Sequence, residues 1–188
     1  ESFEAPYAAM VHDFVVTHDH VIFPIMPLTG SLDRAFKGGP VYAWEPQKGS
    51  HIGIMPRNGS VKDLKWFRGE ASYVFHPMNA FTGGDGKIVC DVCEYPEAPL
   101  FPGVDGQPGD PKKALAKLVR WTFDLNAQTD RYQVEQLDDL VCEFPRLDER
   151  RAGLSYRFGY FAGDTQPPEK VGGFNVIAAI DHQTGKLS

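Results

Sequence analysis

The segment Glu4–Pro24, EAPYAAMVHDFVVTHDHVIFP, decides our interpretation of the fold. Two runs rich in β-branched and aromatic residues, Val11–Val16 and Val21–Met26, predict two strands. The polar residues between these runs predict a turn in which His18 and His20 are solvated. The chain therefore begins with a predicted β-hairpin.

The rest of the chain repeats this alternation of short strands and turns. A long hairpin is predicted at Ala71–Phe81 and Lys87–Tyr95, because the glycine-rich sequence TGGDG between them accepts positive φ angles. A second pair of strands is predicted at Val41–Glu45 and His51–Met55. Further strands are expected at Val61–Phe67, Leu118–Leu125, Tyr132–Asp138, Val141–Arg146, Leu154–Phe161 and Phe174–Ile180.

Helical structure is expected in two short places only, one turn at Leu32–Phe36 and a short helix at Lys112–Lys117. The proline-rich segment Pro96–Pro111 predicts a surface loop or lid. The fold class is therefore all-β. Hairpins that recur about every 30–50 residues are typical of the four-stranded blades of a β-propeller, although a sandwich or a barrel would give a similar rhythm.

Composition restricts the function and the location. The 188 residues include 19 basic and 25 acidic side chains, a net charge of −6, which argues against nucleic acid or an anionic membrane as a partner. No apolar run approaches the roughly 20 residues of a transmembrane helix, and no signal peptide is apparent. Three cysteines indicate no disulfide framework and are typical of a reducing compartment, so we expect a cytoplasmic protein.

His12 and His76 are the candidate metal ligands. Each lies in a predicted strand, and alternation places His12 on the face of Met10 and Phe14. An imidazole on an apolar face needs partners for both ring nitrogens, and a metal on one with a carboxylate on the other would provide them. The alternative is a core histidine bonded to a backbone carbonyl, and 64 residues between the two histidines match no local ligand spacing.

Other candidates have more ordinary interpretations. Cys90 and Cys93 have CxxC spacing, but they lie in a predicted strand without a second such pair, which favours plain packing over zinc. From its pattern alone, Glu143 is a carboxylate at a strand end. His51 is expected to be structural, and His182 to be solvated in a hairpin turn.

An ordered set of segments resembles the carotenoid cleavage oxygenase family, in particular the bacterial lignostilbene dioxygenases. The segments are EAPY (4–7), MVHDF (10–14), HIGIMPR (51–57), WF (66–67), FHPMNAF (75–81), RWTFD (120–124), EFPR (143–146) and LDER (147–150). They cover nearly the whole chain.

The resemblance implies a seven-bladed β-propeller with iron on its axis, held by four histidines. By motif match His12 and His76 would be two of these ligands, and Glu143 would hydrogen-bond a ligand histidine. The other two ligands would lie outside residues 1–188, which we expect to be part of one propeller domain with about three blades. Pro77, where relatives often have an aliphatic or aromatic residue, predicts a bulge beside the metal.

The implied cofactor is Fe(2+), which imidazole ligands suit. The implied reaction is a dioxygenase reaction in which O2 cleaves a conjugated double bond of a phenolic stilbene into two aldehydes. An apocarotenoid substrate is the first alternative, and a non-catalytic propeller that serves as a binding platform is the second. Beyond the metal site we expect no catalytic residue here, and we leave open a homodimer.

Overall fold

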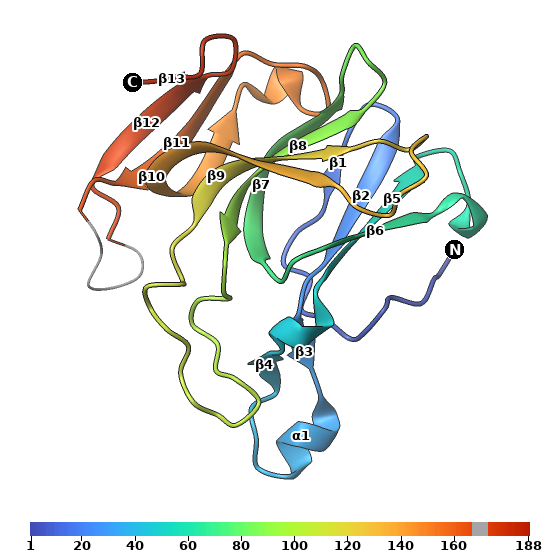
Figure 1. Ribbon diagram of the computed structural model, residues 1–188, viewed down its shortest axis with the longest axis vertical. Coiled ribbons are helices and arrows are strands. Elements are labelled where there is room, and N and C mark those ends of the chain that lie inside the picture. Colours follow the sequence, from blue (N-terminus) through green and yellow to red (C-terminus); the bar gives the residue numbers. More distant parts are fainter. Residues whose placement is uncertain (167–172) are drawn as a thin grey trace.

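The computed structural model describes residues 1–166 and 173–188, and antiparallel strands form most of it (Figure 1). One four-stranded sheet has the strand order β1-β2-β5-β6. Its strands are β1 (Val15–Val16), β2 (His20–Ile25), β5 (Ser50–Pro56) and β6 (Lys65–Gly69). Ile22 and Ile52 are fully buried, and Phe67 packs against Phe123 of the neighbouring sheet with ring centroids 5.3 Å apart. Apolar burial therefore joins the two sheets.

The second sheet is a continuous meander of seven strands. These are β7 (Tyr73–Thr82), β8 (Ile88–Tyr95), β9 (Lys117–Phe123), β10 (Gln133–Leu147), β11 (Phe158–Asp164), β12 (Val176–Asp181) and β13 (Lys186–Leu187). The 15-residue strand β10 pairs with β9 mainly through residues 133–136 and with β11 through residues 141–147. The two strands predicted at 132–138 and 141–146 are therefore one, shared by two four-stranded units.

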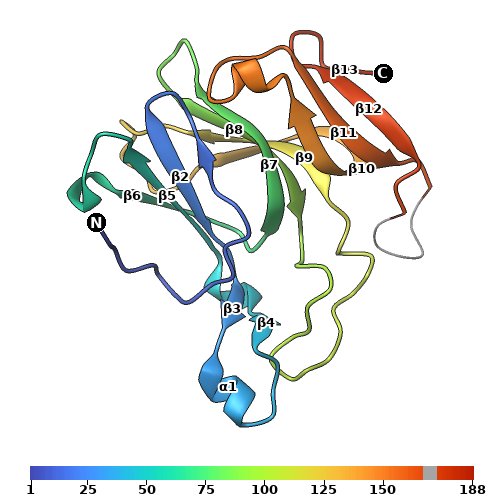
Figure 2. The same cartoon turned by 180° about the vertical axis from the view of Figure 1, so that it is seen from behind.

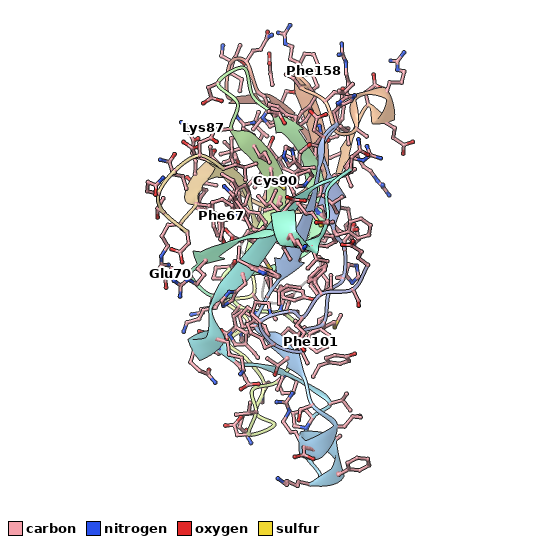
Figure 3. The ribbon with its side chains drawn as sticks, turned by 90° about the vertical axis from the view of Figure 1, so that its right-hand side faces the viewer. Phe67, Glu70, Lys87, Cys90, Phe101 and Phe158 are labelled. Atoms are coloured by element: carbon pink, nitrogen blue, oxygen red, sulfur yellow. The ribbon has the colours of Figure 1, made fainter. Side chains whose placement is uncertain are left out.

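The described residues thus form three four-stranded units, as three consecutive blades would. The first strand of each unit lies next to that of the following unit, since β1 contacts β7 and β7 contacts β10. In Figure 2, β2, β5 and β6 lie to the left of β7, and β10 to β13 lie to its right. In the side view of Figure 3, Cys90 of the central unit lies within the body, while Phe158 and Phe101 lie toward opposite ends.

A small lobe projects from the sheets at the bottom of Figure 1. It contains β3 (Leu28–Gly30), which pairs with β4 (Tyr42–Trp44), and the helix α1 (Leu32–Phe36) between them. The helical turn predicted there is confirmed. The loop after β8 joins the lobe, because the Trp44 N–H donates to the Pro102 carbonyl over 2.8 Å.

Between residues 41 and 117, three local predictions were wrong. Residues 41–45 do not pair with residues 51–55, because a 3-10 turn at Pro46–Lys48 and a positive φ at Gly49 redirect the chain, so that β5 joins β2 and β6. Residues 61–63, which were predicted to begin a strand, form a 3-10 turn capped by Ser60, and the strand β6 begins at Lys65. The predicted helix at 112–117 is a turn, which Asp110 stabilises by accepting from the Lys112 N–H, and Lys117 already belongs to β9.

The predicted strand at 11–16 is mostly absent, since only Val15 and Val16 pair with β2. The Met10 N–H donates to the carbonyl of Leu28 over 2.8 Å, which holds the preceding chain at the lobe and away from the edge of β2. His12 consequently lies in exposed, non-strand backbone. Within the described residues, no helix is long and apolar enough to cross a membrane.

Candidate metal centre

His76, in β7, is bonded to a buried carboxylate. Its Nδ1 lies 2.7 Å from Oε2 of Glu143, which comes from β10, 67 residues further along the chain. Because an ionised carboxylate only accepts hydrogen bonds, a neutral His76 carries its proton on Nδ1 and keeps a lone pair on Nε2. A metal-binding histidine adopts this tautomer when a carboxylate holds its other nitrogen.

A β-bulge presents Glu143 to the histidine. The register between β10 and β11 shifts between Glu143 and Arg146, and Phe144 within the bulge has a φ of 53°, which is uncommon for a bulky residue. The Phe144 N–H also donates to Oε2 of Glu143. Glu143 is 3% exposed, and its Oε1 is buried without a hydrogen-bond partner among the described residues. The carboxylate is therefore fixed on one side only.

The bulge predicted at Pro77 is confirmed, because the register between β7 and β8 shifts on both sides of this proline. Proline has no N–H to donate to the ladder, so a break in pairing at this position has a direct cause. The two bulges, at Pro77 and at Phe144, lie beside the two members of the His76–Glu143 pair.

His12 lies next to His76 although no strand holds it. The two ring centroids are 5.1 Å apart and the rings are nearly perpendicular, at 88°. An ion about 2.1 Å from a nitrogen of each ring is compatible with this separation. Neutral imidazoles suit iron among other transition metals, so the two side chains fit as part of such a donor set. Residues 1–166 and 173–188 contain no group of three or more histidine, cysteine, aspartate or glutamate side chains placed to bind a metal.

Aromatic side chains surround the two histidines. Phe75 packs edge-on against His12 at 5.0 Å, and Phe144 lies 5.4 Å from His76. Tyr95 packs edge-on against Phe75 at 5.7 Å. Burial and, to a lesser extent, the Glu143 carboxylate raise the pKa of the Tyr95 hydroxyl. These rings give the two histidines largely apolar neighbours, although His12 and Phe144 are themselves exposed.

Of the remaining histidines, two have the environment predicted from the sequence and two do not. His18 is exposed and bonded to Asp19, and the Nε2 of His51, in β5, lies 3.3 Å from the Lys48 carbonyl oxygen. His20 is not a solvated turn residue, because it begins β2 and its Nδ1 is buried without a described partner. The side chain of His182 is only 6% exposed, since it packs against Tyr156 with centroids 4.6 Å apart.

A second buried carboxylate, Asp91, was missed by the sequence interpretation. Arg120 binds it with two hydrogen bonds, of 2.7 and 2.9 Å, and the Tyr156 hydroxyl donates a third of 2.6 Å. Nη2 of Arg120 also lies 3.2 Å from Nδ1 of His182. Asp91 and Arg120 are direct cross-strand neighbours in β8 and β9, so a correct strand register would have predicted this pair.

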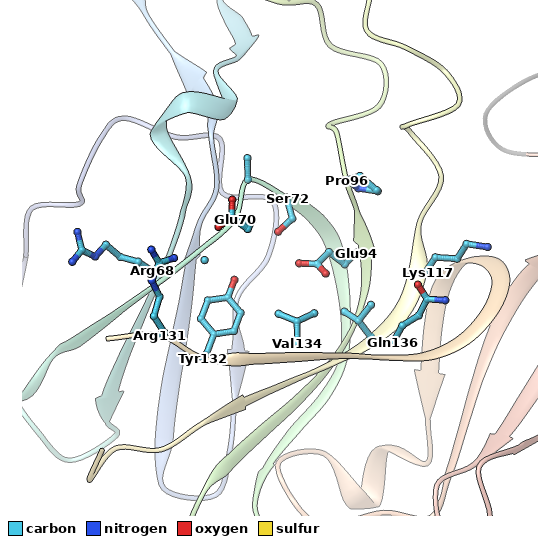
Figure 4. Close-up of a pocket in the computed structure, with 13 residues that line it drawn as sticks. Arg68, Glu70, Ser72, Glu94, Pro96, Lys117, Arg131, Tyr132, Val134 and Gln136 are labelled. Carbon is cyan, nitrogen blue, oxygen red and sulfur yellow. The ribbon is translucent and has the colours of Figure 1, made fainter. Parts of the chain in front are cut away.

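A separate pocket lies between the end of β6 and strands β8–β10 (Figure 4). Glu94, Tyr132 and Ser72 face it from inside, while Arg68 and Lys117 lie at its rim. Burial raises the pKa of the Glu94 carboxyl. None of the candidate metal residues lines this pocket, so it is separate from the His12–His76 site.

The sequence pattern of the family described as "Retinal pigment epithelial membrane protein" matches residues 1–188. The chain belongs to this family. The carotenoid cleavage oxygenases are its members, and the resemblance stated from the sequence is confirmed. Isoeugenol monooxygenase of Pseudomonas putida is 40% identical over 99% of the chain, and lignostilbene-α,β-dioxygenase isozyme III of Sphingomonas paucimobilis is 36% identical over 98%.

The crystal structure of Pseudomonas brassicacearum lignostilbene dioxygenase superimposes on 99% of this carotenoid oxygenase chain with a TM-score of 0.90 and 36% identity. The predicted all-β propeller fold is thereby confirmed. The chain spans 42% and 40% of the two enzymes and 41% of the crystallised chain, or about two fifths of their length.

Proposed function

We propose that this chain is part of a non-haem iron(II) oxygenase that cleaves a carbon–carbon double bond conjugated to a phenol ring. The observation that carries the proposal is the His76–Glu143 pair, 2.7 Å between the bonded atoms, with the His12 ring beside it. Iron(II) held by neutral imidazoles would supply open coordination positions for dioxygen.

The chain's own residues have distinct roles in this proposal. His12 and His76 are two of the metal ligands, and Glu143 keeps the Nδ1 proton of His76 in place so that Nε2 faces the ion. Phe75 and Phe144 pack against the rings of the two ligands. The remaining ligands would come from outside the described residues.

The substrate class rests on what the relatives are named for. Isoeugenol and lignostilbene are both phenols with a conjugated alkene, so we infer a substrate of this type for the present protein. In the dioxygenase form of the reaction, each alkene carbon takes one oxygen atom from the same O2, and two aldehydes result without another reductant. A stilbene with a para-hydroxyl group is the first substrate to test.

The test is oxygen uptake by the full-length protein loaded with iron(II), given 4-hydroxystilbene, isoeugenol or an apocarotenal in turn, with His76→Ala as the control. We expect uptake with the phenolic alkenes, loss of uptake in the variant, and label from ¹⁸O₂ in both aldehydes. Oxygen uptake with the apocarotenal alone would show that the substrate is an apocarotenoid and not a phenolic alkene. A protein that binds no iron would contradict the proposal and favour the binding-platform alternative.

A further inference from the structure

The Glu143 carboxylate, which holds His76, has one oxygen without a described hydrogen-bond donor. Its Oε2 accepts from His76 and from the Phe144 N–H, whereas Oε1 is buried without a described partner. Leaving a buried carboxylate oxygen without a donor is costly, and native structures rarely do so. A carboxylate held through one oxygen can also rotate and carry the imidazole with it.

Tyr95 is the candidate donor, because its ring packs edge-on against Phe75, the residue before His76, with centroids 5.7 Å apart. It lies in β8, on the same face as Cys93, whose Sγ is 3.4 Å from Sγ of Cys142, the residue before Glu143. This side of β8 thus faces the backbone that carries the carboxylate. Tyr95 is 5% exposed, and the Glu143 carboxylate is one of the groups that raise its pKa, after burial itself. A buried tyrosine hydroxyl normally has a partner.

We propose that Tyr95 is a positioning residue whose hydroxyl donates to Oε1 of Glu143. Tyr95, Glu143 and His76 then form one hydrogen-bonded chain that holds the imidazole with Nε2 directed at the metal. Both carboxylate oxygens are occupied, so the His76 ring keeps its orientation and its basicity as a ligand. This inference rests on the proposed function, since it assigns Tyr95 a role in the same metal site.

The test is a cobalt(II) titration of the metal-free full-length protein, followed by the visible absorption of the bound ion. Tyr95→Phe removes the donor and keeps the ring that packs against Phe75. We expect its Kd for cobalt(II) to rise about 10-fold, as for the loss of other outer partners of ligand histidines. Tyr132→Phe is the matched control, because it also removes a tyrosine hydroxyl, but one that lines the separate pocket. Its Kd should stay within about twofold of wild type.

A double substitution tests whether Tyr95 affects cobalt(II) binding through Glu143. In the Glu143→Gln background the charged acceptor is gone, so adding Tyr95→Phe should change the Kd by less than about twofold. If Tyr95→Phe alone binds cobalt(II) as tightly as wild type while Glu143→Gln binds more weakly, Tyr95 has no role and the proposed function stands. If His76→Ala binds as tightly as wild type, the proposed function itself is wrong.

A crystal structure of the metal-loaded protein gives an answer that does not depend on how the variants fold. A distance of about 2.5–3.0 Å between the Tyr95 hydroxyl oxygen and Oε1 of Glu143 supports the proposal. A water molecule or another side chain on Oε1 in place of Tyr95 overturns it.

Discussion

The molecule contains two buried carboxylates that are used in opposite ways. Asp91 is fully buried and accepts three hydrogen bonds, two from Arg120 and one from Tyr156. Glu143 is almost as buried, yet only its Oε2 has described partners, the Phe144 N–H and a histidine whose Nε2 has no described partner. A structural ion pair needs hydrogen-bond donors on both carboxylate oxygens, because a buried charge without a partner is costly.

The difference shows which carboxylate is available for function. The Asp91 cluster joins β8, β9 and the segment before β11, and both oxygens of its carboxylate accept hydrogen bonds. In the Glu143–His76 pair, by contrast, Nε2 of His76 has no hydrogen-bond partner among the described residues.

Asp91→Asn should have the largest effect, and it should be on stability. The substitution leaves Arg120 with a buried neutral partner, and breaking a buried pair in this way costs about 3–5 kcal/mol. Thermal and urea unfolding of the full-length protein measure it. Cobalt(II) affinity of the folded fraction should not change, and a large loss of affinity would show that the two regions are not independent.

Glu143→Gln should show the reverse pattern. Metal affinity is expected to fall about 10–100-fold, because the carboxylate that holds the His76 tautomer is gone, while the free energy of unfolding of the metal-free protein changes by less than about 1 kcal/mol. Calorimetric titration and urea unfolding report the two quantities. A loss of stability as large as that of Asp91→Asn would mean that Glu143 is a structural residue.

Phe144→Val tests whether the bulge aims the carboxylate. A β-branched residue disfavours the positive φ of 53° seen at this position, whereas glycine accepts it. We expect valine to raise the Kd for cobalt(II) about 10-fold through a misplaced Glu143. Phe144→Gly, the control, loses the same ring but should stay within about threefold. Equal effects of the two variants would assign the role to the ring and not to the backbone.

The smallest effect concerns the acid stability of the Asp91 cluster. Burial lowers the pKa of His182, with Asp91, Arg120 and Asp181 as the charged neighbours. An unfolded histidine titrates near about 6.5, so below this pH the unfolded state binds more protons than the folded one and stability falls as the pH decreases. His182→Gln should remove this part of the pH dependence, measured as Tm between pH 7.5 and 5.5. An unchanged profile would show that His182 does not titrate on unfolding.

Prediction from the sequence succeeded where local patterns carry the information. The hairpin of β7 and β8 follows from alternation around a glycine-rich turn, the bulge at Pro77 follows from the missing N–H, and α1 was predicted with the bounds that the structure shows. It failed where a partner far along the chain decides, as at residues 11–14, which the lobe holds away from β2. His182 was misjudged for the same reason, because Tyr156, 26 residues earlier, covers it.

The sequence by itself determined the all-β class and the family, because strand alternation, turn residues and an ordered set of motifs are local properties of the chain. It also supplied His12, His76 and Glu143 as candidates, through motifs and not through spacing. Only the tertiary structure decided that His12 and His76 lie 5.1 Å apart and that Glu143 bonds Nδ1 of His76. The physical reason is that His12 lies in non-strand backbone, His76 in β7 and Glu143 in β10. Contacts between such distant segments depend on how whole sheets pack and not on any local pattern of residues.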